Sequence, residues 1–169
     1  DSFKDLGVKI YVNEIEENIN YINNIHYSKD TISNIDNIEL GNHMHYILEN
    51  LNFLNPNYDI YNELETEIIK GLLNHKIMNN IRNATIYKEY EFIYDEENQT
   101  KHGIIDLMLE YDNYIDIIDY KLKNTMDKAY LNQLNGYRKY IENKTKKKVS
   151  TYLYSLLNKE LEKISWIKK

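Results

Sequence analysis

The sequence predicts an α/β fold in which helices flank a mixed central β-sheet and further helices precede that sheet. Apolar residues recur at helical spacing in several segments of the first half of the chain. From residue 84 the pattern changes to the alternation that is typical of strands. A helical segment then separates the third predicted strand from the fourth, as in a crossover between strands of one sheet.

Three helices are expected before the sheet, over residues 8–25, 40–53 and 61–82. Residues 26–38 are polar and are expected to form a linker. Proline interrupts a helix, so residues 55–57 (Asn-Pro-Asn) separate the second helix from the third. We therefore divide the chain into an N-terminal helical or linker segment, residues 1–38, and one folded domain, residues 39–169.

The strands are expected over residues 84–94, 103–111, 114–122 and 149–156. A polar turn at 96–100 joins the first two. A helix over 127–143 and a polar loop over 144–148 connect the third strand to the fourth. The tail beyond residue 156 is expected to be helical or irregular.

The composition excludes several classes of protein. The chain has 169 residues and no cysteine, which excludes disulfides, thiolate zinc sites, iron–sulfur clusters and cysteine catalysis. No apolar run is long enough for a membrane span and no signal peptide is visible, so we expect a cytoplasmic protein without a membrane partner. The net charge of -6 mildly disfavours a protein that coats nucleic acid, but it does not argue against an enzyme that gathers carboxylates at one site.

Two carboxylates are expected to face each other across the second and third strands. A two-residue turn at 112–113 (Asp-Asn), which suits residues with positive φ, places Asp106 opposite Asp119. Opposed carboxylates repel in an apolar strand pair, so a shared proton, the nearby Lys121 or a divalent cation must compensate them. Carboxylate oxygens suit Mg²⁺ or Mn²⁺. The alternative is a solvent-exposed face with ordinary charges, which we expect for Asp116 on the opposite side of the strand.

Five segments in this order resemble the motifs of one enzyme family. They are 41–45 (Gly-Asn-His-Met-His), 88–92 (Lys-Glu-Tyr-Glu-Phe), 103–106 (Gly-Ile-Ile-Asp), 118–121 (Ile-Asp-Tyr-Lys) and 130–137 (Tyr-Leu-Asn-Gln-Leu-Asn-Gly-Tyr). The set resembles the PD-(D/E)XK nucleases, and more narrowly the nuclease domain of RecB- and AddA-type helicase–nucleases. The resemblance covers about residues 41–157 and implies a restriction-endonuclease-like core.

The resemblance implies roles for five residues. His45, Asp106 and Asp119 would ligate Mg²⁺ or Mn²⁺, and the backbone carbonyl of Tyr120 would be a further ligand. Lys121 would orient the attacking water or stabilise charge on the phosphorane, so that Asp106, Asp119 and Lys121 form the catalytic set. An imidazole among the ligands favours Mn²⁺ somewhat over Mg²⁺.

Gln133 and Tyr137 are four residues apart and share a helical face, which in this family borders the active site and contacts the DNA strand. Tyr137 by itself also fits a core position, and His45 by itself fits a partly buried histidine with a hydrogen-bond partner. His43 is expected at the surface, and His102 matches no motif. Glu89 is either a neighbour of the ligands or an ordinary strand charge.

The function that the resemblance implies is metal-dependent cleavage of DNA, as an exonuclease on single-stranded ends in repair or recombination. A helicase motor in the same or a partner chain would supply the strand, because this sequence has no GxxxxGK[ST] phosphate loop of its own. The start at Asp1 rather than Met is typical of a domain from a longer chain; the alternative is a stand-alone exonuclease. Two further alternatives are a structure-specific or restriction-type endonuclease and a catalytically inactive DNA-binding or docking module.

Overall fold

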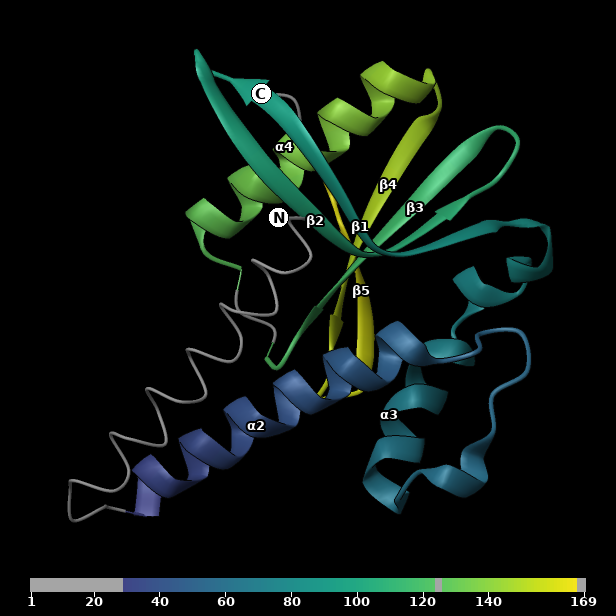
Figure 1. Ribbon diagram of the computed structural model, residues 1–169, viewed down its shortest axis with the longest axis vertical. Coiled ribbons are helices and arrows are strands. Elements are labelled where there is room, and N and C mark those ends of the chain that lie inside the picture. The colour runs from purple at the N-terminus through teal and green to yellow at the C-terminus, as the bar shows by residue number, and fades with distance from the viewer. Residues whose placement is uncertain (1–28, 124–125, 167–169) are drawn as a thin grey trace, which may run out of the picture.

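The protein has an α/β fold with a five-stranded mixed sheet flanked by helices. The computed structural model describes residues 29–123 and 126–166, with side chains from residue 37 onward. The sheet order is β1-β2-β3-β4-β5 (Figure 1). Neighbouring strands are antiparallel except for β3 and β4, which are parallel. The strands are β1 (Thr85–Glu96), β2 (Gln99–Glu110), β3 (Tyr114–Lys121), β4 (Lys148–Ser155) and β5 (Glu160–Ile164).

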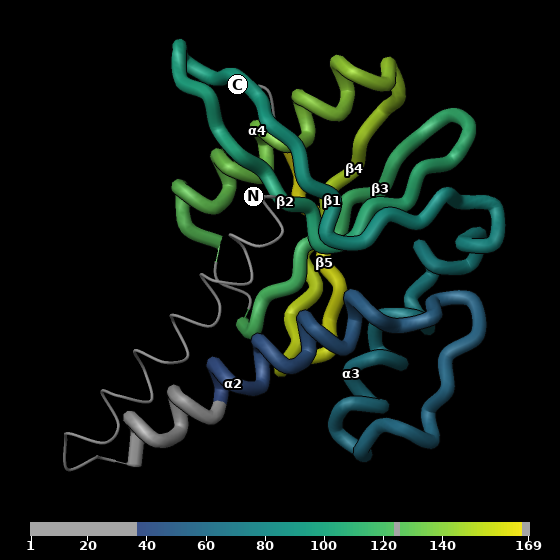
Figure 2. The backbone as a smooth tube through the Cα atoms, viewed as in Figure 1, coloured from purple at the N-terminus to yellow at the C-terminus, as the bar shows by residue number. Residues whose placement is uncertain are grey.

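Helices cover both faces of the sheet, and each face has its own apolar core. Helices α2 (Lys29–Asn50) and α3 (Glu63–Leu73) pack on one face through residues such as Leu48 and Ile68. Helix α4 (Lys128–Thr145) packs on the other face through residues such as Leu134. Figure 2 shows α4 and the pair α2 and α3 at opposite ends of the twisted sheet.

The predicted order of strands and the crossover helix is confirmed, whereas the predicted tail and the first helices need correction. The expected helical or irregular tail forms strand β5 instead, because Glu160–Ile164 pairs with the exposed edge of β4. The expected linker is helical from residue 29, so the boundary proposed at 38 lies inside α2. The expected helix over 61–82 is shorter, since α3 ends at Leu73 and 3-10 turns at Lys76–Met78 and Ile81–Asn83 follow. The helix predicted over residues 8–25 lies outside the described residues.

The hairpin between β2 and β3 has the predicted register. The Tyr111 N–H donates to the Tyr114 carbonyl at 2.9 Å, and Leu107 pairs with Ile118. The turn residues Asp112 and Asn113 achieve this without the positive φ angles that were expected. Beyond the Leu107–Ile118 pair the ladder ends, and the β1–β2 hairpin separates from β3 (Figure 1). The separation opens a fork in the sheet at Asp106 and Asp119.

No helix within the described part of the chain is long and apolar enough to cross a membrane.

Candidate metal centre and active site

Asp106 lies on β2 where the fork opens, and it is buried, with 8% of its surface exposed. Its Oδ2 atom accepts a hydrogen bond of 2.7 Å from the Tyr120 N–H on β3. Since the β2–β3 ladder stops one position earlier, this side chain takes the place of a backbone partner across the fork. The contact fixes Asp106 against the strand that carries the second carboxylate.

Asp119 and Lys121 lie on β3, on the face that α4 covers. Asp119 Oδ2 accepts a hydrogen bond of 2.6 Å from the Tyr130 hydroxyl in the first turn region of α4. The Lys121 ammonium lies 3.5 Å from the centre of the same tyrosine ring. The Asp127 carboxylate caps α4 by accepting from the Tyr130 N–H at 2.8 Å. One capped helix end therefore orients both β3 side chains through Tyr130.

His45 reaches the fork from α2, in the layer opposite α4. Its Nδ1 atom is 3.6 Å from Asp106 Oδ1, and its ring meets the Tyr120 ring edge to face with centroids 5.6 Å apart. The neighbouring Met44 and Leu48 are fully buried in the core that joins α2 to the sheet. That packing fixes the rotation of α2, which turns His45 towards Asp106.

Glu89 completes a set of candidate ligands from three different elements. One ligand atom each from His45, Glu89 and Asp106 can be chosen so that all of them lie within 4.8 Å of one another. Glu89 has a φ of 50° in the middle of β1, an unfavourable conformation for a residue with a side chain. Lys88 and Tyr90 both pair with β2, whereas Glu89, which the register places opposite Asp106, does not. Such strain is typical of functional sites.

The two aspartates of this cluster have raised pKa values. Burial raises the pKa of Asp106 well above its ordinary range, and the charges of Asp119 and Glu89 raise it further. Burial also raises the pKa of Asp119, although the Tyr130 hydroxyl opposes this effect. The two aspartates share a hydrogen bond. For His45, burial lowers the pKa, which favours the neutral imidazole that can ligate a metal.

A cleft of about 690 Å³ opens onto the cluster. It contains all the residues that the sequence singled out for catalysis, metal binding and DNA contact: His45, Asp106, Asp119, Tyr120, Lys121, Gln133 and Tyr137. Gln133 Nε2 donates to the Tyr137 hydroxyl at 2.8 Å, so these two side chains form one unit of the wall. Tyr137 also belongs to the α4 core, as its spacing predicted. The catalytic, metal-binding and DNA-binding roles of all these residues stay predictions.

Three polar members of the cleft, Glu89, Tyr130 and His102, were assigned no definite role in the site from the sequence, although Glu89 was considered as a neighbour of the ligands. The position of Glu89 opposite Asp106 could have been predicted by the same residue counting that paired the two aspartates. The tight turn at Glu97 and Asn98, two residues with positive φ, sets the register between β1 and β2. Tyr130 fits an apolar helix stripe, which conceals its hydroxyl contact with Asp119. His102 shares the strand face of Asp106 by alternation.

Two of the remaining predictions have opposite outcomes. His43 is exposed, as expected, and its Nε2 atom is 2.9 Å from Glu65 Oε2. The expected exposure of Asp116 is wrong, because only 6% of its surface is exposed. It pairs with Ser150 on the neighbouring strand β4 and shares a pocket with Lys76 and Ile77 of the 3-10 turn. Asp116 shares a strand face with Ile118 and Tyr120, and both of these pack in the core beneath α2 and α3. This agrees with its predicted position on the face opposite Asp119.

Neither known protein families nor curated protein sequences give a match to this chain.

Proposed function

We propose that the protein is a metal-dependent deoxyribonuclease that hydrolyses phosphodiester bonds. The observation that carries this proposal is the convergence of His45, Glu89 and Asp106 from three separate elements, with Asp119 and Lys121 beside them in an open cleft. A set of carboxylates, one imidazole and one lysine is what metal-assisted phosphate chemistry requires.

The residues fit a divalent cation of the Mg²⁺ or Mn²⁺ type. Carboxylate oxygens are the ligands that these ions prefer, and the imidazole of His45 shifts the preference towards Mn²⁺. The cluster contains three carboxyl groups, those of Asp106, Asp119 and Glu89. The pKa values of the two aspartates are raised, which indicates that the cluster has too little positive charge to keep all of its carboxyl groups ionised. A dication would supply that charge and would hold all three groups in their ionised form.

A bound ion would lower the pKa of a water molecule and polarise a phosphate oxygen. Lys121 would then act as a point charge against the phosphate, or as the group that orients the attacking water. Its ammonium already lies over the Tyr130 ring, which limits the positions that the long side chain takes. Gln133 and Tyr137 line the same cleft and would contact the nucleic acid strand beside the cleaved bond.

We further propose that the substrate is single-stranded DNA with a free end, presented by a helicase motor in the same or a partner chain. The sequence resemblance supports this part of the proposal. The test compares linear and covalently closed circular single-stranded DNA with Mn²⁺, with Mg²⁺ and with EDTA. Metal-dependent loss of linear DNA alone is expected, whereas cutting of closed circles would replace the exonuclease with an endonuclease.

Variants separate catalysis from mere binding. Lys121→Ala should lower the cleavage rate by about 10²–10³-fold, the usual cost of removing a group that stabilises transition-state charge. Asp119→Ala should abolish both cleavage and metal binding. Asp112→Asn, a matched change at an exposed turn residue of the same hairpin, should leave both unchanged. If neither metal supports cleavage and Asp119→Ala does not alter metal binding, the protein is an inactive DNA-binding or docking module.

A further inference from the structure

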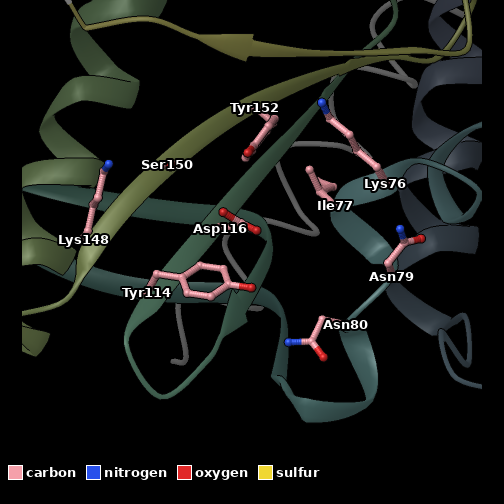
Figure 3. Close-up of a pocket in the computed structure, with 9 residues that line it drawn as sticks. All are labelled: Lys76, Ile77, Asn79, Asn80, Tyr114, Asp116, Lys148, Ser150 and Tyr152. Atoms are coloured by element: carbon pink, nitrogen blue, oxygen red, sulfur yellow. The ribbon is translucent and has the colours of Figure 1, made fainter.

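A second pocket lies on the other face of the sheet, away from the metal cluster. It has a volume of about 450 Å³, within the range of roughly 300–1,000 Å³ that is typical of small-molecule sites. Strands β3 and β4 form one wall, and the 3-10 turn Lys76–Met78 with the residues after it forms the other. In Figure 3, Asp116 lies between Tyr114 and Tyr152.

Asp116 is the unusual group of this pocket. It is more than nine-tenths buried, yet among the described residues none donates a hydrogen bond to its carboxylate or forms an ion pair with it. Burial raises its pKa to about 6, and the charge of Lys163 on β5, two strands away across β4, opposes that shift. Most of the residue is covered, but its carboxylate lines the pocket, where a ligand that carries hydrogen-bond donors could bind it.

The charges around Asp116 restrict what that donor can be. Lys148 and Lys76 lie on opposite sides of the carboxylate (Figure 3), and Lys163 is the third cation nearby. These lysines would repel a free amine or a metal ion. The ligand must therefore bring neutral N–H or O–H donors to Asp116 and carry its own negative charge, which the lysines can bind.

The two tyrosines favour a planar ring as the part of the ligand that reaches Asp116. Tyr114 is 39% exposed and is held by stacking on Tyr111, with ring centroids 4.5 Å apart. Tyr152 lines the same pocket. Aromatic side chains of this kind bind nucleobases by stacking, and each stacked base contributes about 1–3 kcal/mol. A planar base with an attached phosphate satisfies the rings and the lysines together.

We propose that this pocket binds a guanine nucleotide, with Asp116 accepting hydrogen bonds from the guanine N1–H and N2–H groups and with Lys76 or Lys148 contacting its phosphate. Guanine presents two adjacent donors on one edge, which match the two oxygens of a carboxylate. Adenine presents one donor next to an acceptor that the carboxylate would repel. The site is independent of the proposed nuclease activity, because it uses none of the residues of the metal cluster.

The test measures binding of guanosine monophosphate and adenosine monophosphate by isothermal titration calorimetry in EDTA, where no metal-dependent cleavage occurs. The guanine nucleotide is expected to bind at least about tenfold more tightly, as one charge-assisted hydrogen bond would give. Asp116→Asn should remove that preference and favour xanthosine monophosphate, because the amide can donate to the C2 carbonyl of xanthine. Lys148→Gln should weaken the binding of guanosine monophosphate but not the binding of guanosine, which has no phosphate.

A change of preference from guanine to xanthine identifies direct contact with the base, which a general loss of folding cannot produce. Asp59→Asn, at an exposed position outside the pocket, is the matched control and should bind as the parent does. Oligonucleotides with and without a single guanine distinguish a base in a strand from a free nucleotide as the source. Equal binding of guanine and adenine in both forms, or binding that Asp116→Asn leaves unchanged, overturns the proposal.

Discussion

Replacing Asp106 with Asn should stabilise the metal-free protein at neutral pH, although Asp106 is a proposed ligand. The pKa of Asp106 is raised by burial and by the charges of Asp119 and Glu89. When the pKa of a carboxyl is higher in the folded state than in the unfolded state, the group stabilises the fold most at a pH below its pKa in the unfolded state, about 3.9. This stabilisation is lost as the pH rises through the pKa in the folded state. At pH 7 the metal-free protein therefore carries an electrostatic cost that the variant avoids.

The size of the gain follows from the contacts of Asp106. Repulsion between two carboxylates about 4 Å apart amounts to about 4 kcal/mol at an effective dielectric constant of 20. The proton that the pair retains relieves part of this repulsion. Asn keeps an oxygen that can accept from the Tyr120 N–H, so only the charge-assisted part of the 2.7 Å bond is lost, about 1 kcal/mol. The expected net gain is about 1–2 kcal/mol, or a rise in Tm of roughly 2–8 °C for a domain of this size.

Thermal unfolding in EDTA and in Mn²⁺ checks this prediction. The difference between the variant and the parent should shrink as the pH falls below about 4, where the carboxyl becomes protonated in the unfolded state as well as in the folded state. Mn²⁺ at about one hundred times its Kd should stabilise the parent by about 2.7 kcal/mol and the variant by much less. Asp112→Asn is the control for a change of net charge. A lower stability of Asp106→Asn than of the parent in EDTA at pH 7, or equal stabilisation of the variant and the parent by Mn²⁺, refutes the reasoning.

Two further predictions concern groups around the cluster. Tyr130→Phe keeps the ring but removes the hydroxyl that donates to Asp119 at 2.6 Å, so the free energy of unfolding of the metal-free protein in urea should fall by about 1.5–3 kcal/mol. Because this hydrogen bond lowers the pKa of Asp119, the acid limb of the cleavage–pH profile should move to higher pH in the variant. An unchanged pH profile would count against this contact. Gly103→Ala should lower the free energy of unfolding by about 1–3 kcal/mol, because the added Cβ would approach the Phe92 ring to 2.4 Å. Gly41→Ala in α2 is the comparison: its added Cβ would have ordinary contacts of 3.7 Å or more, so this variant should be neutral or stabilising by up to about 1 kcal/mol. Equal effects in the two glycine variants would contradict the close packing at Gly103.

Local patterns in the sequence account for the central hairpin and for the two aspartates. The length of the turn at 112–113 and the alternation of β2 and β3 set the register, and this register carries Asp106 and Asp119 to facing positions. The crossover helix and the parallel strand after it follow from the change of period alone. The same kind of local count also reaches Glu89, through the tight turn at Glu97 and Asn98.

Packing between distant segments decided the rest. His45 enters the site because the core fixes the rotation of α2, and the positive φ of Glu89 arises where β1 lies against the fork. Asp116 is buried at the bottom of a pocket to which the turn at Lys76–Met78 contributes a wall, although its strand pattern suits an exposed charge. Residues 29–38 are helical, and β5 forms by pairing with an edge of β4 that no local signal reveals. Alternation and turn length act over a few residues and can be read from the sequence, whereas burial and ligand convergence depend on which surfaces meet after the chain has folded.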